Sequence, residues 1–480
     1  MNDSTEQSNI MPKLSIMMFL QFWIWGSWYV SIPNYIGTLD YMGFEAYYAY
    51  EAGPLAAMIA PFFLGLFADR FFNTEKILAF LFLGAGACMF CLPVIGDLQG
   101  TVVQISDASG EMKEALQVSF LGTTWLKHKL FSTVTLIHML CFMPTLALTA
   151  SISFQHLKKG GNHFPLVRLW GTFGWIFAGI ALPLIYNQYE MIDGIKQVTI
   201  KGEETAGQFT IGGWAAVSLG IFSLIALPKT PAPKKGQKIN MADLFFLDVW
   251  KEFKRPSFFI FVLCSFLICI PLQAYYAYLQ TQMGAQGFSN ITIWKNTGTW
   301  IEAFMMFAMP FFFRKLGVKK MITIGIGAWV LRYALFPLAA SYGIIPADSG
   351  ININGFQVPF TNMAFLFIIG GVMLHGLCYD FFFVTGQVYV DQVTDKKIRG
   401  QAQSMIIFFT QGLGMYIGAK LNWYIFTKVF NADYAIAGAG ENAAKWADFW
   451  WPLCGIAAVI LVVFLITFKH KDKEGAELTH

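Results

Sequence analysis

The sequence predicts an all-α membrane protein in which twelve transmembrane helices form two six-helix halves. Three observations support this prediction. Charged residues are scarce, apolar runs of helix length recur along the whole chain, and basic residues gather in every second loop. A weak repeat between the two halves points in the same direction, because basic residues follow the second and the eighth apolar run alike, at Arg70 and Arg314.

Composition indicates that most of the protein surface faces lipid. Charged residues make up 13% of the 480 residues, and hydrophobic residues make up 56%. The mean hydropathy is +0.52. A soluble domain carries about 25% charged residues, because its surface must face water. We therefore expect the lipid bilayer as the main partner and no nucleic acid.

Twelve apolar runs are long enough to cross a bilayer core, which takes about 20 residues of helix. The first six lie near 14–34, 47–68, 76–95, 130–153, 167–185 and 212–228. The second six lie near 257–281, 291–313, 320–341, 361–389, 402–427 and 447–468. The first run has no small-residue cleavage site after it, so we interpret it as a span and not as a signal peptide. This order predicts an N-terminal bundle over 1–228, a linker over 229–256 and a C-terminal bundle over 257–480.

Basic residues predict the orientation of these spans, because cytoplasmic loops carry an excess of Lys and Arg. If the N-terminus is cytoplasmic, the cytoplasmic segments hold 22 Lys and Arg residues, and the opposite loops hold 7 although they are longer. We therefore expect both termini in the cytoplasm.

The linker begins with the Pro- and Lys-rich stretch PKTPAPKKGQK and continues as NMADLFFLDVWKEFKRP. Phe246, Val249, Trp250 and Phe253 stand at i, i+3, i+4 and i+7, which places them on one helix face. This spacing predicts an amphipathic helix on the inner leaflet. The alternative is a loop with a short helical turn.

Charged residues inside the runs are few, and such residues usually face an internal cavity because lipid cannot solvate them. The deep ones are Arg168, Glu302, Arg332 and Asp380. Three others lie nearer the run ends, where a long side chain can reach the interface: Glu51, Lys295 and Lys420.

Helical spacing places polar and aromatic residues on the same faces as these charges. The sets are Arg168, Thr172 and Trp175; Gln273, Tyr276 and Gln280; Thr299 and Glu302; His375, Tyr379 and Asp380; and Gln21, Trp25 and Trp28. Such stripes either line a binding cavity or only join neighbouring helices by hydrogen bonds, and both interpretations stay open. His375 is either a packing residue or a proton carrier, and we interpret His138 as structural.

Two carboxylates are candidates for coupling transport to protons. Asp380 and Arg168 both lie toward the cytoplasmic side of their runs, so we expect them to neutralise one another when substrate is absent. Glu302 has no cation nearby along its run except Lys295. An isolated carboxylate in an apolar environment binds a proton readily, so we predict Glu302 as the coupling residue and Asp380 as its rival.

Motifs of enzymes and metal proteins are absent from the sequence. It contains no Walker loop, no HExxH, no Gly-x-Ser-x-Gly and no clustered Cys and His residues, which are the signatures of such sites. The seven cysteines lie in apolar runs, where we expect them to pack as small apolar side chains. We therefore predict no enzyme activity, no metal site and no cofactor.

Several stretches together resemble the nucleoside:H+ symporter family of the major facilitator superfamily. They are LQFWIWGSW (20–28), GLFADRFF (65–72), RLWGTFGW (168–175), LDVWKEFKRPSFFIF (247–261), AWVLRYALF (328–336) and HGLCYDFFF with the following TG (375–386). The resemblance runs through both halves. It implies proton-driven nucleoside uptake by alternating access across the inner membrane, by a protein that functions as a monomer, with H+ as the coupling ion.

The resemblance also implies roles for individual residues. The positions that agree in residue type with family positions for binding or coupling are Arg168, Thr172, Gln273, Glu302 and Asp380. The positions that depart are Trp175 and Tyr379 in place of Phe, Tyr276 in place of Asn, Thr299 in place of Gln, and His375 in place of Tyr. Sugars use the same acidic, Arg and aromatic groups, so an oligosaccharide or glycoside:H+ symporter is the alternative within transport. A receptor or scaffold without transport activity is the alternative from another class.

Overall fold

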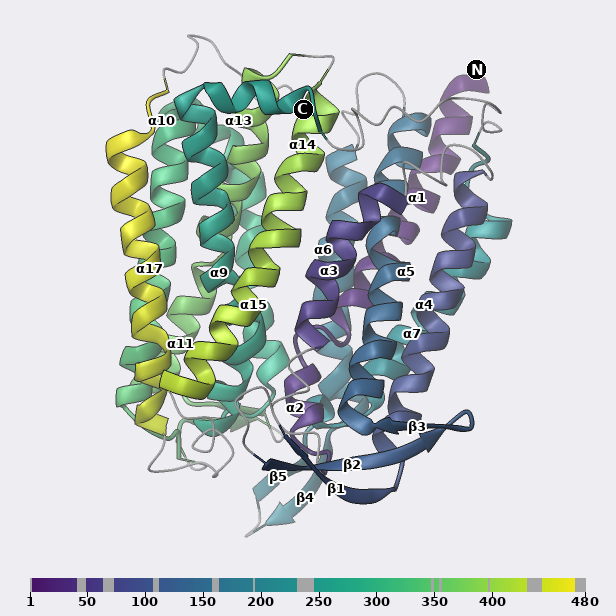
Figure 1. Cartoon of the computed structure of the whole chain (residues 1–480), viewed down its shortest axis with the longest axis vertical. Coiled ribbons are helices and arrows are strands. Elements are labelled where there is room, and N and C mark those ends of the chain that lie inside the picture. Colours follow the sequence, from purple (N-terminus) through teal and green to yellow (C-terminus); the bar gives the residue numbers. More distant parts are fainter. Residues whose placement is uncertain are drawn as a thin grey trace. The chain divides into compact units, whose positions relative to one another are not determined.

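The computed structural model describes residues 2–40, 49–63, 73–106, 112–157, 164–192, 195–230, 246–346, 349–353, 356–395, 398–429 and 443–470. It separates into two compact helical units (Figure 1). The N-terminal unit comprises Met1–Asp193 and Gln197–Gln237, and the C-terminal unit comprises Gly194–Lys196 and Lys238–His480. Each unit is described below by itself. The GLFADRFF stretch at 65–72 lies outside the described residues.

The N-terminal unit contains a helix at each of the first six predicted spans. Its helices are α1 (Asn2–Gly26), α2 (Ile32–Ile36), α3 (Ala49–Phe63), α4 (Thr74–Asp97), α5 (Lys127–His156), α6 (Phe164–Tyr186) and α7 (Gly207–Ile225). Helix α1 packs along α6 and α7, and α5 packs along α3 and α4. The predicted span 14–34 is not one helix, because the chain turns after Gly26 and a new helix starts at Ile32. Pro33 explains the restart, since proline is favoured only in the first turn of a helix.

The C-terminal unit also contains a helix at each predicted span. Its helices are α9 (Pro256–Ala285), α10 (Ile291–Ser341), α11 (Met363–Met373), α12 (His375–Tyr379), α13 (Thr385–Val393), α14 (Arg399–Ile407), α15 (Met415–Tyr424) and α17 (Trp446–Thr467). Within the described ranges, π-helical segments interrupt them at η5 (Asp380–Val384), η6 (Phe408–Gly414) and η7 (Ile425–Val429). Helix α10 packs against α11, α12 and α17, and α9 packs against α15 and α17.

Helix α10 contains two of the predicted spans. It is 51 residues long. A straight helix of that length would extend about 76 Å, since each residue adds about 1.5 Å. A bilayer core is only roughly 30 Å thick. Gly317 breaks the helix with φ 69° and ψ 176°. A positive φ of this kind favours glycine, which has no Cβ. The two arms on either side of Gly317 correspond to the predicted spans 291–313 and 320–341.

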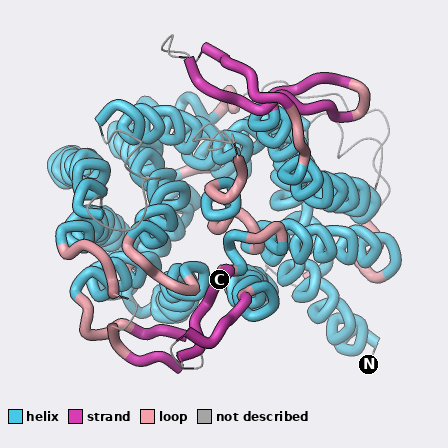
Figure 2. The backbone as a smooth tube through the Cα atoms, turned by 90° about the horizontal axis from the view of Figure 1, so that it is seen from below, coloured by secondary structure: helices cyan, strands magenta, loops and turns pink. Residues whose placement is uncertain are grey.

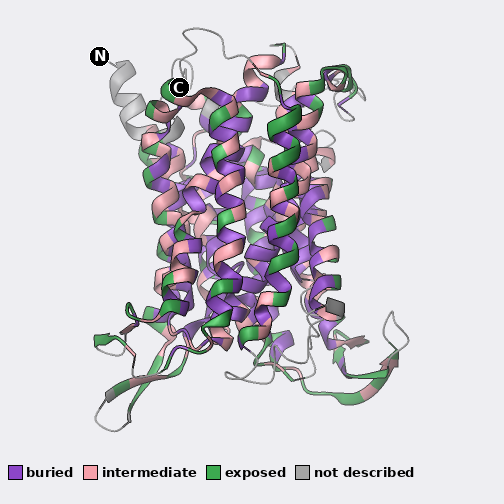
Figure 3. Cartoon of the chain, turned by 90° about the vertical axis from the view of Figure 1, so that its left-hand side faces the viewer, coloured by how far each residue is buried: buried purple, intermediate pink, exposed green. Residues whose placement is uncertain are grey.

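Exposed residues recur along the helices (Figure 3). Many of them are large and apolar, as expected for a surface in lipid. Examples are Phe80, which is 75% exposed, and Ile466, which is 70% exposed. Eight helices among the described residues are long and apolar enough to cross a membrane, and α10 is one of them.

Strands connect several helices, and the sequence analysis did not predict them (Figure 2). They are β1 (Thr101–Ser106), β2 (Met112–Phe120), β3 (Thr123–Leu126), β4 (Gln188–Ile192), β5 (Ile195–Ile200), β6 (Ile351–Ile353) and β7 (Phe356–Val358). Strands β1, β2 and β3 form one antiparallel sheet, in which Thr101 pairs with Gln117 and Gln117 with Leu126. Leu116 and Val118 of β2 are buried, and packing of such side chains stabilises a sheet.

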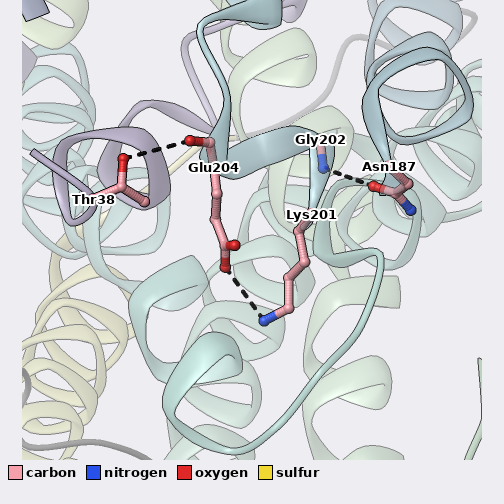
Figure 4. Close-up of polar contacts among 5 residues, drawn as sticks. All are labelled: Thr38, Asn187, Lys201, Gly202 and Glu204. Carbon is pink, nitrogen blue, oxygen red and sulfur yellow. Dashed lines mark hydrogen bonds and ion pairs between the residues drawn. The ribbon is translucent and has the colours of Figure 1, made fainter. Parts of the chain in front are cut away.

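The segment between α6 and α7 is held by polar contacts (Figure 4). It contains the short 3-10 helix η3 (Gly202–Glu204). The backbone N–H of Gly202 donates to Oδ1 of Asn187 at 2.6 Å. Lys201 pairs with Glu204 at 3.5 Å, and the hydroxyl of Thr38 donates to the carbonyl of Glu204 at 3.5 Å. These contacts fasten the segment to the ends of α2 and α6.

The end of the linker differs from the predicted amphipathic helix. Residues Val249–Lys254 form the 3-10 helix η4, and residues 231–245 lie outside the described residues. Phe246 and Val249 are buried, and the ring of Trp250 lies 6.2 Å from that of Phe409 in η6. The described part is therefore a short helical turn in which Phe246 and Val249 are buried and Trp250 is 47% exposed. The amphipathic helix over the rest of the linker stays a prediction.

Candidate functional site

Helix α6 carries the predicted N-terminal site residues along one face. The guanidinium carbon of Arg168 lies 4.0 Å from the ring centroid of Phe22 in α1. Thr172 is buried one turn further along α6, and Trp175 meets Trp25 of α1 edge to face, with the ring centroids 5.5 Å apart. The spacing of Arg168, Thr172 and Trp175 therefore does bring them to the α1–α6 contact.

Glycines allow this close contact between α1 and α6. A Cβ on Gly174 would lie 2.0 Å from the carbonyl oxygen of Phe19. A Cβ on Gly171 would lie 2.6 Å from the ring of Phe22. Only residues without a side chain fit where two helix backbones approach so closely.

Aromatic rings surround Trp25 in the N-terminal unit. Trp25 lies 5.5 Å from Tyr29 and 5.7 Å from Phe142, measured between ring centroids. Its indole Nε1 has no hydrogen-bond partner among the described residues. Aromatic faces next to an available polar group are suited to a flat, partly polar molecule.

The other members of the α1 stripe have structural roles. Gln21 donates to Thr145 at 3.0 Å and accepts from Thr149 at 2.8 Å, so it joins α1 to α5. Trp28 is buried against His138, with the ring centroids 5.3 Å apart. Nδ1 of His138 in turn lies 3.0 Å from the carbonyl oxygen of Ala85 in α4. Within this stripe, Trp25 therefore lies beside α6, whereas Gln21 and Trp28 take part in packing between helices.

Glu302 and His375 form the central polar contact of the C-terminal unit. Oε2 of Glu302 in α10 lies 3.5 Å from Nε2 of His375 in α12. Gly376 allows this approach, because a Cβ there would lie 2.9 Å from the carbonyl oxygen of Ile301. Glu302 therefore has a neighbour in another helix that its own sequence surroundings did not indicate.

Asp380 lies nearby, at the start of the π-helical segment η5. It is completely buried, and neither carboxylate oxygen has a hydrogen-bond partner among the described residues. Its charge interacts with that of Glu302. π-helical turns occur often at functional sites, where they redirect side chains.

Tyr275 of α9, which the sequence analysis did not single out, contacts several of the buried charges. Its ring stacks on His375 with the centroids 5.4 Å apart. The guanidinium carbon of Arg332 lies 4.3 Å from the centroid of the same ring, and Nζ of Lys295 lies 5.0 Å from it. The stripe of Gln273, Tyr276 and Gln280 did not include Tyr275 because it lies to one side of their face.

Lys295 corrects one expectation, because it does not reach toward the membrane interface. The residue is 5% exposed, and its ammonium donates to the carbonyl oxygens of Tyr275 and Tyr276 at 3.3 Å each. Arg332 is also fully buried and donates to the carbonyls of Gly371 and Val372. Buried cations need such acceptors because lipid and apolar side chains provide none.

The remaining predicted residues lie around this group. Gln273 is fully buried where α9 crosses α15, and a Cβ on Gly418 would lie 3.1 Å from the Cβ of Gln273. The rings of Tyr276 and Tyr275 lie 5.5 Å apart, and those of Tyr379 and His375 lie 5.8 Å apart. Thr299 is partly buried, one turn before Glu302 in α10.

The candidate residues thus form two groups, one in each unit. Arg168, Thr172 and Trp175 belong to the N-terminal unit, and the other seven belong to the C-terminal unit. The predicted pairing of Arg168 with Asp380 joins the two units and stays a prediction. Within the described ranges, no group of three or more His, Cys, Asp or Glu residues is arranged to hold a metal ion.

Comparisons with known proteins agree over nearly the whole chain. The family model described as "Nucleoside H+ symporter" matches residues 8–102 and 115–473. "Putative nucleoside transporter YegT" of Escherichia coli (strain K12) is 30% identical over 462 residues, which cover 96% of this chain and 94% of that protein. Xanthosine permease of the same organism is 25% identical over 477 residues, or 96% of each chain. The crystal structure of nucleoside transporter NupG has a TM-score of 0.71 at 24% identity, covering 96% of this chain and 100% of that chain.

Proposed function

Because this chain belongs to the nucleoside H+ symporter family, we propose that it carries nucleosides into the cell together with protons, with Glu302 as the coupling residue. The observation behind the proposal is the pair of acids in the C-terminal unit, of which Glu302 is partly buried and Asp380 is fully buried. Glu302 contacts His375, and Asp380 is buried with both oxygens unpartnered within the described part of the chain. Both acids lie in apolar helices, where a permanent uncompensated charge is costly.

The candidate residues include aromatic and polar side chains, and these two kinds suit the base and the ribose of a nucleoside. Trp175 and Trp25 of the N-terminal unit, and Tyr276 and Tyr379 of the C-terminal unit, offer aromatic faces on which a base stacks. Ribose hydroxyls pair with charged and amide groups, and the candidates are Arg168, Thr172, Gln273, Thr299 and Glu302. A neutral nucleoside needs a coupling ion for accumulation, and a titratable carboxylate provides a site for H+.

Protonation of Glu302 would control the movement of the loaded carrier. When the helices close over Glu302 and exclude water, a charged carboxylate opposes this closure, because an apolar environment disfavours the ion. Once protonated, the side chain is neutral, and the loaded carrier changes its orientation. Asp380 would then serve as a gate or binding residue, with Arg168 as its partner in the empty carrier.

The cellular setting follows from the charge distribution and the family. We place the protein in the inner membrane with both termini cytoplasmic, because 22 basic residues lie in one set of loops and 7 in the other, and basic loops stay in the cytoplasm. Residues 1–228 and 257–480 act as the two moving bundles, joined by the linker 229–256. The carrier works as a monomer without a cofactor.

Proteoliposomes containing the purified protein test the assignment of Glu302. Uridine is supplied outside with an inward proton gradient, and a pH dye inside reports proton entry. Glu302→Gln has the shape of the protonated acid, so it should abolish accumulation and uridine-induced proton entry. It should keep uridine binding and exchange, because these do not require a titratable group at this position.

The control is Glu114→Gln in strand β2, which removes an exposed carboxylate outside the spans. It should transport as the wild type does. Normal proton entry in Glu302→Gln, with loss in Asp380→Asn, would transfer the coupling role to Asp380. Competition by disaccharides but not by nucleosides would instead favour the oligosaccharide alternative.

A further inference from the structure

His375 is a buried imidazole in direct contact with the proposed coupling residue. Its side chain is 7% exposed, and Nε2 lies 3.5 Å from Oε2 of Glu302. The other ring nitrogen, Nδ1, has no hydrogen-bond partner within the described part of the chain. A buried nitrogen without a partner is costly, so this nitrogen is expected to receive one during the working cycle.

Packing holds the imidazole in this orientation. Its ring stacks on Tyr275 with an interplanar angle of 19°, and the ring of Tyr379 lies on a neighbouring side. Gly298 of α10 allows close packing, because a Cβ there would lie 3.0 Å from Cβ of His375. The ring therefore presents one nitrogen to Glu302, while the other stays available. The separation of 3.5 Å between Nε2 and Oε2 is long for a hydrogen bond, but such bonds often tighten only when substrate is bound.

The charges around His375 disfavour an imidazole that stores the proton as a cation. Among the described residues, three titratable side chains contact it directly: Glu302 on α10, Tyr275 on α9 and Tyr379 on α12. Behind them lie Lys295 and Arg332, which contact Tyr275, and Asp380, whose charge interacts with that of Glu302. Arg332 and Lys295 are buried and lie over the ring of Tyr275, which stacks on His375, and like charges repel strongly where water is excluded. The imidazole is therefore suited to passing a proton on and remaining neutral.

We propose that His375 relays the coupled proton to Glu302, an inference that rests on the proposed function of Glu302. A hydrated proton binds Nδ1 and leaves a water molecule, and the proton on Nε2 passes to Oε2 of the ionised carboxylate. The Nε2–H bond breaks as the Oε2–H bond forms. The imidazole is neutral before and after the step, and the pair gains one proton. The reverse sequence returns the proton on the cytoplasmic side.

Two simpler roles compete with this one. His375 could only fill space between α10 and α9, or it could only bind the nucleoside. A packing residue would be replaced by Phe with little loss of transport, since Phe keeps the stacking on Tyr275. A binding residue would change the nucleoside concentration at half-maximal rate, whereas a relay changes the maximal rate of proton-driven uptake.

The experiment compares His375→Gln and His375→Phe in proteoliposomes. Gln keeps a hydrogen bond to Glu302 and Phe keeps the aromatic packing, but neither passes a proton between two nitrogens. Both should keep uridine exchange and half-maximal concentration within about threefold of the wild type, because substrate binding is not the step that they remove. The maximal rate of proton-driven uptake should fall at least about tenfold, as expected when a positioned acid–base group is lost. It should also lose its dependence on external pH.

The matched control is His138→Gln. His138 is another buried histidine, and its Nδ1 lies 3.0 Å from a backbone carbonyl oxygen, while its Nε2 has no hydrogen-bond partner among the described residues. The pH profile of this variant should be that of the wild type. Wild-type rates and pH profile in both His375 variants, with coupling lost in Glu302→Gln, would overturn the relay and leave the proposed function intact. Coupling retained in Glu302→Gln would instead overturn the proposed function.

A second measurement follows the tautomer of His375 directly. Infrared difference spectra of protein with isotope-labelled histidine are recorded at high and low pH, and the same spectra of His375→Gln are subtracted to remove the signal of the other six histidines. The remaining signal distinguishes the two neutral tautomers of the His375 ring. The relay predicts a change from Nε2–H to Nδ1–H on acidification, with a simultaneous carboxylic acid band that is absent in Glu302→Gln. An imidazole spectrum that does not change with pH, or one that becomes cationic, would contradict the relay.

Discussion

Tyr275 is the residue around which the buried charges of the C-terminal unit gather. Its ring contacts Arg332, Lys295 and His375, and its carbonyl accepts from Lys295. The two cations balance the two carboxylates Glu302 and Asp380 in number. This arrangement explains how a membrane span contains the two cations, because Lys295 and Arg332 both donate to backbone carbonyls and lie over the ring of Tyr275.

Lys295→Met tests this balance at the level of one side chain. Methionine has a similar length but no charge, so the variant loses two hydrogen bonds to α9 and leaves the acidic pair short of one cation. We expect a loss of about 1–3 kcal/mol in stability, seen as a lower midpoint of thermal unfolding in detergent. The half-maximal uridine concentration should rise, because Tyr276 loses its anchor.

Lys315→Met is the control for this substitution. Lys315 is exposed and lies 4.3 Å from the ring of Phe311. Its loss should change stability by no more than about 0.5 kcal/mol, as is usual for surface substitutions. Equal unfolding midpoints in the two lysine variants would show that the contacts of Lys295 contribute no stability.

For individual residues, the sequence indicated which charged side chains lie inside the membrane spans, but it did not indicate which residues contact them. Glu302 and Asp380 stood out because charge is rare in apolar runs. Their contacts join residues of different helices, such as Glu302 with His375, and no local spacing shows such contacts. The resemblance to the nucleoside H+ symporter family was confirmed by the family match, whereas the binding role of each residue stays a prediction.

Among the helices, α1 and α6 have the closest glycine-mediated contact described for the site. Gly174→Ala places a methyl group 2.0 Å from the carbonyl oxygen of Phe19, so the two helices must separate. We expect a loss of about 1–3 kcal/mol, as for other overpacked contacts, together with reduced uridine binding. Thermal unfolding and a binding assay in detergent measure both effects.

Gly327→Ala in α10 provides the comparison. A Cβ at Gly327 would have nothing within 4 Å. This variant should keep or slightly raise the unfolding midpoint, because alanine favours helix. If both glycine variants were as stable as the wild type, the proposed tight packing of α1 on α6 would be wrong.

The positions of the helices could be predicted from the apolar runs, whereas the irregularities within the helices could not. The π-helical turn at Asp380 and the break after Gly26 depend on local backbone geometry and on packing between helices. The hairpins in the loops were also missed. The alternation in β2 buries Leu116 and Val118, but its residues lie between long apolar runs that dominate the pattern.

For the whole molecule, composition and apolar runs predicted twelve helices in two halves, the resemblance identified this architecture as the major facilitator fold, and the comparisons confirmed it. The orientation stays a prediction from basic residues. Single cysteines in a cysteine-free background test it with an impermeant thiol reagent applied to intact cells. Thr124→Cys in β3 should react, and Lys251→Cys in η4 should not, although both positions are exposed. The reverse pattern would show that the termini lie outside.

The break at Gly317 also matters for how the chain is made. Both arms of α10 contact the ring of Tyr275, the first through Lys295 and the second through Arg332. Gly317 is the non-helical residue between the two arms. We therefore expect the two arms to enter the bilayer together during synthesis, as one helical hairpin. Its turn carries Arg314 and Lys315, and the predicted orientation places such basic residues on the cytoplasmic side, where the ribosome is.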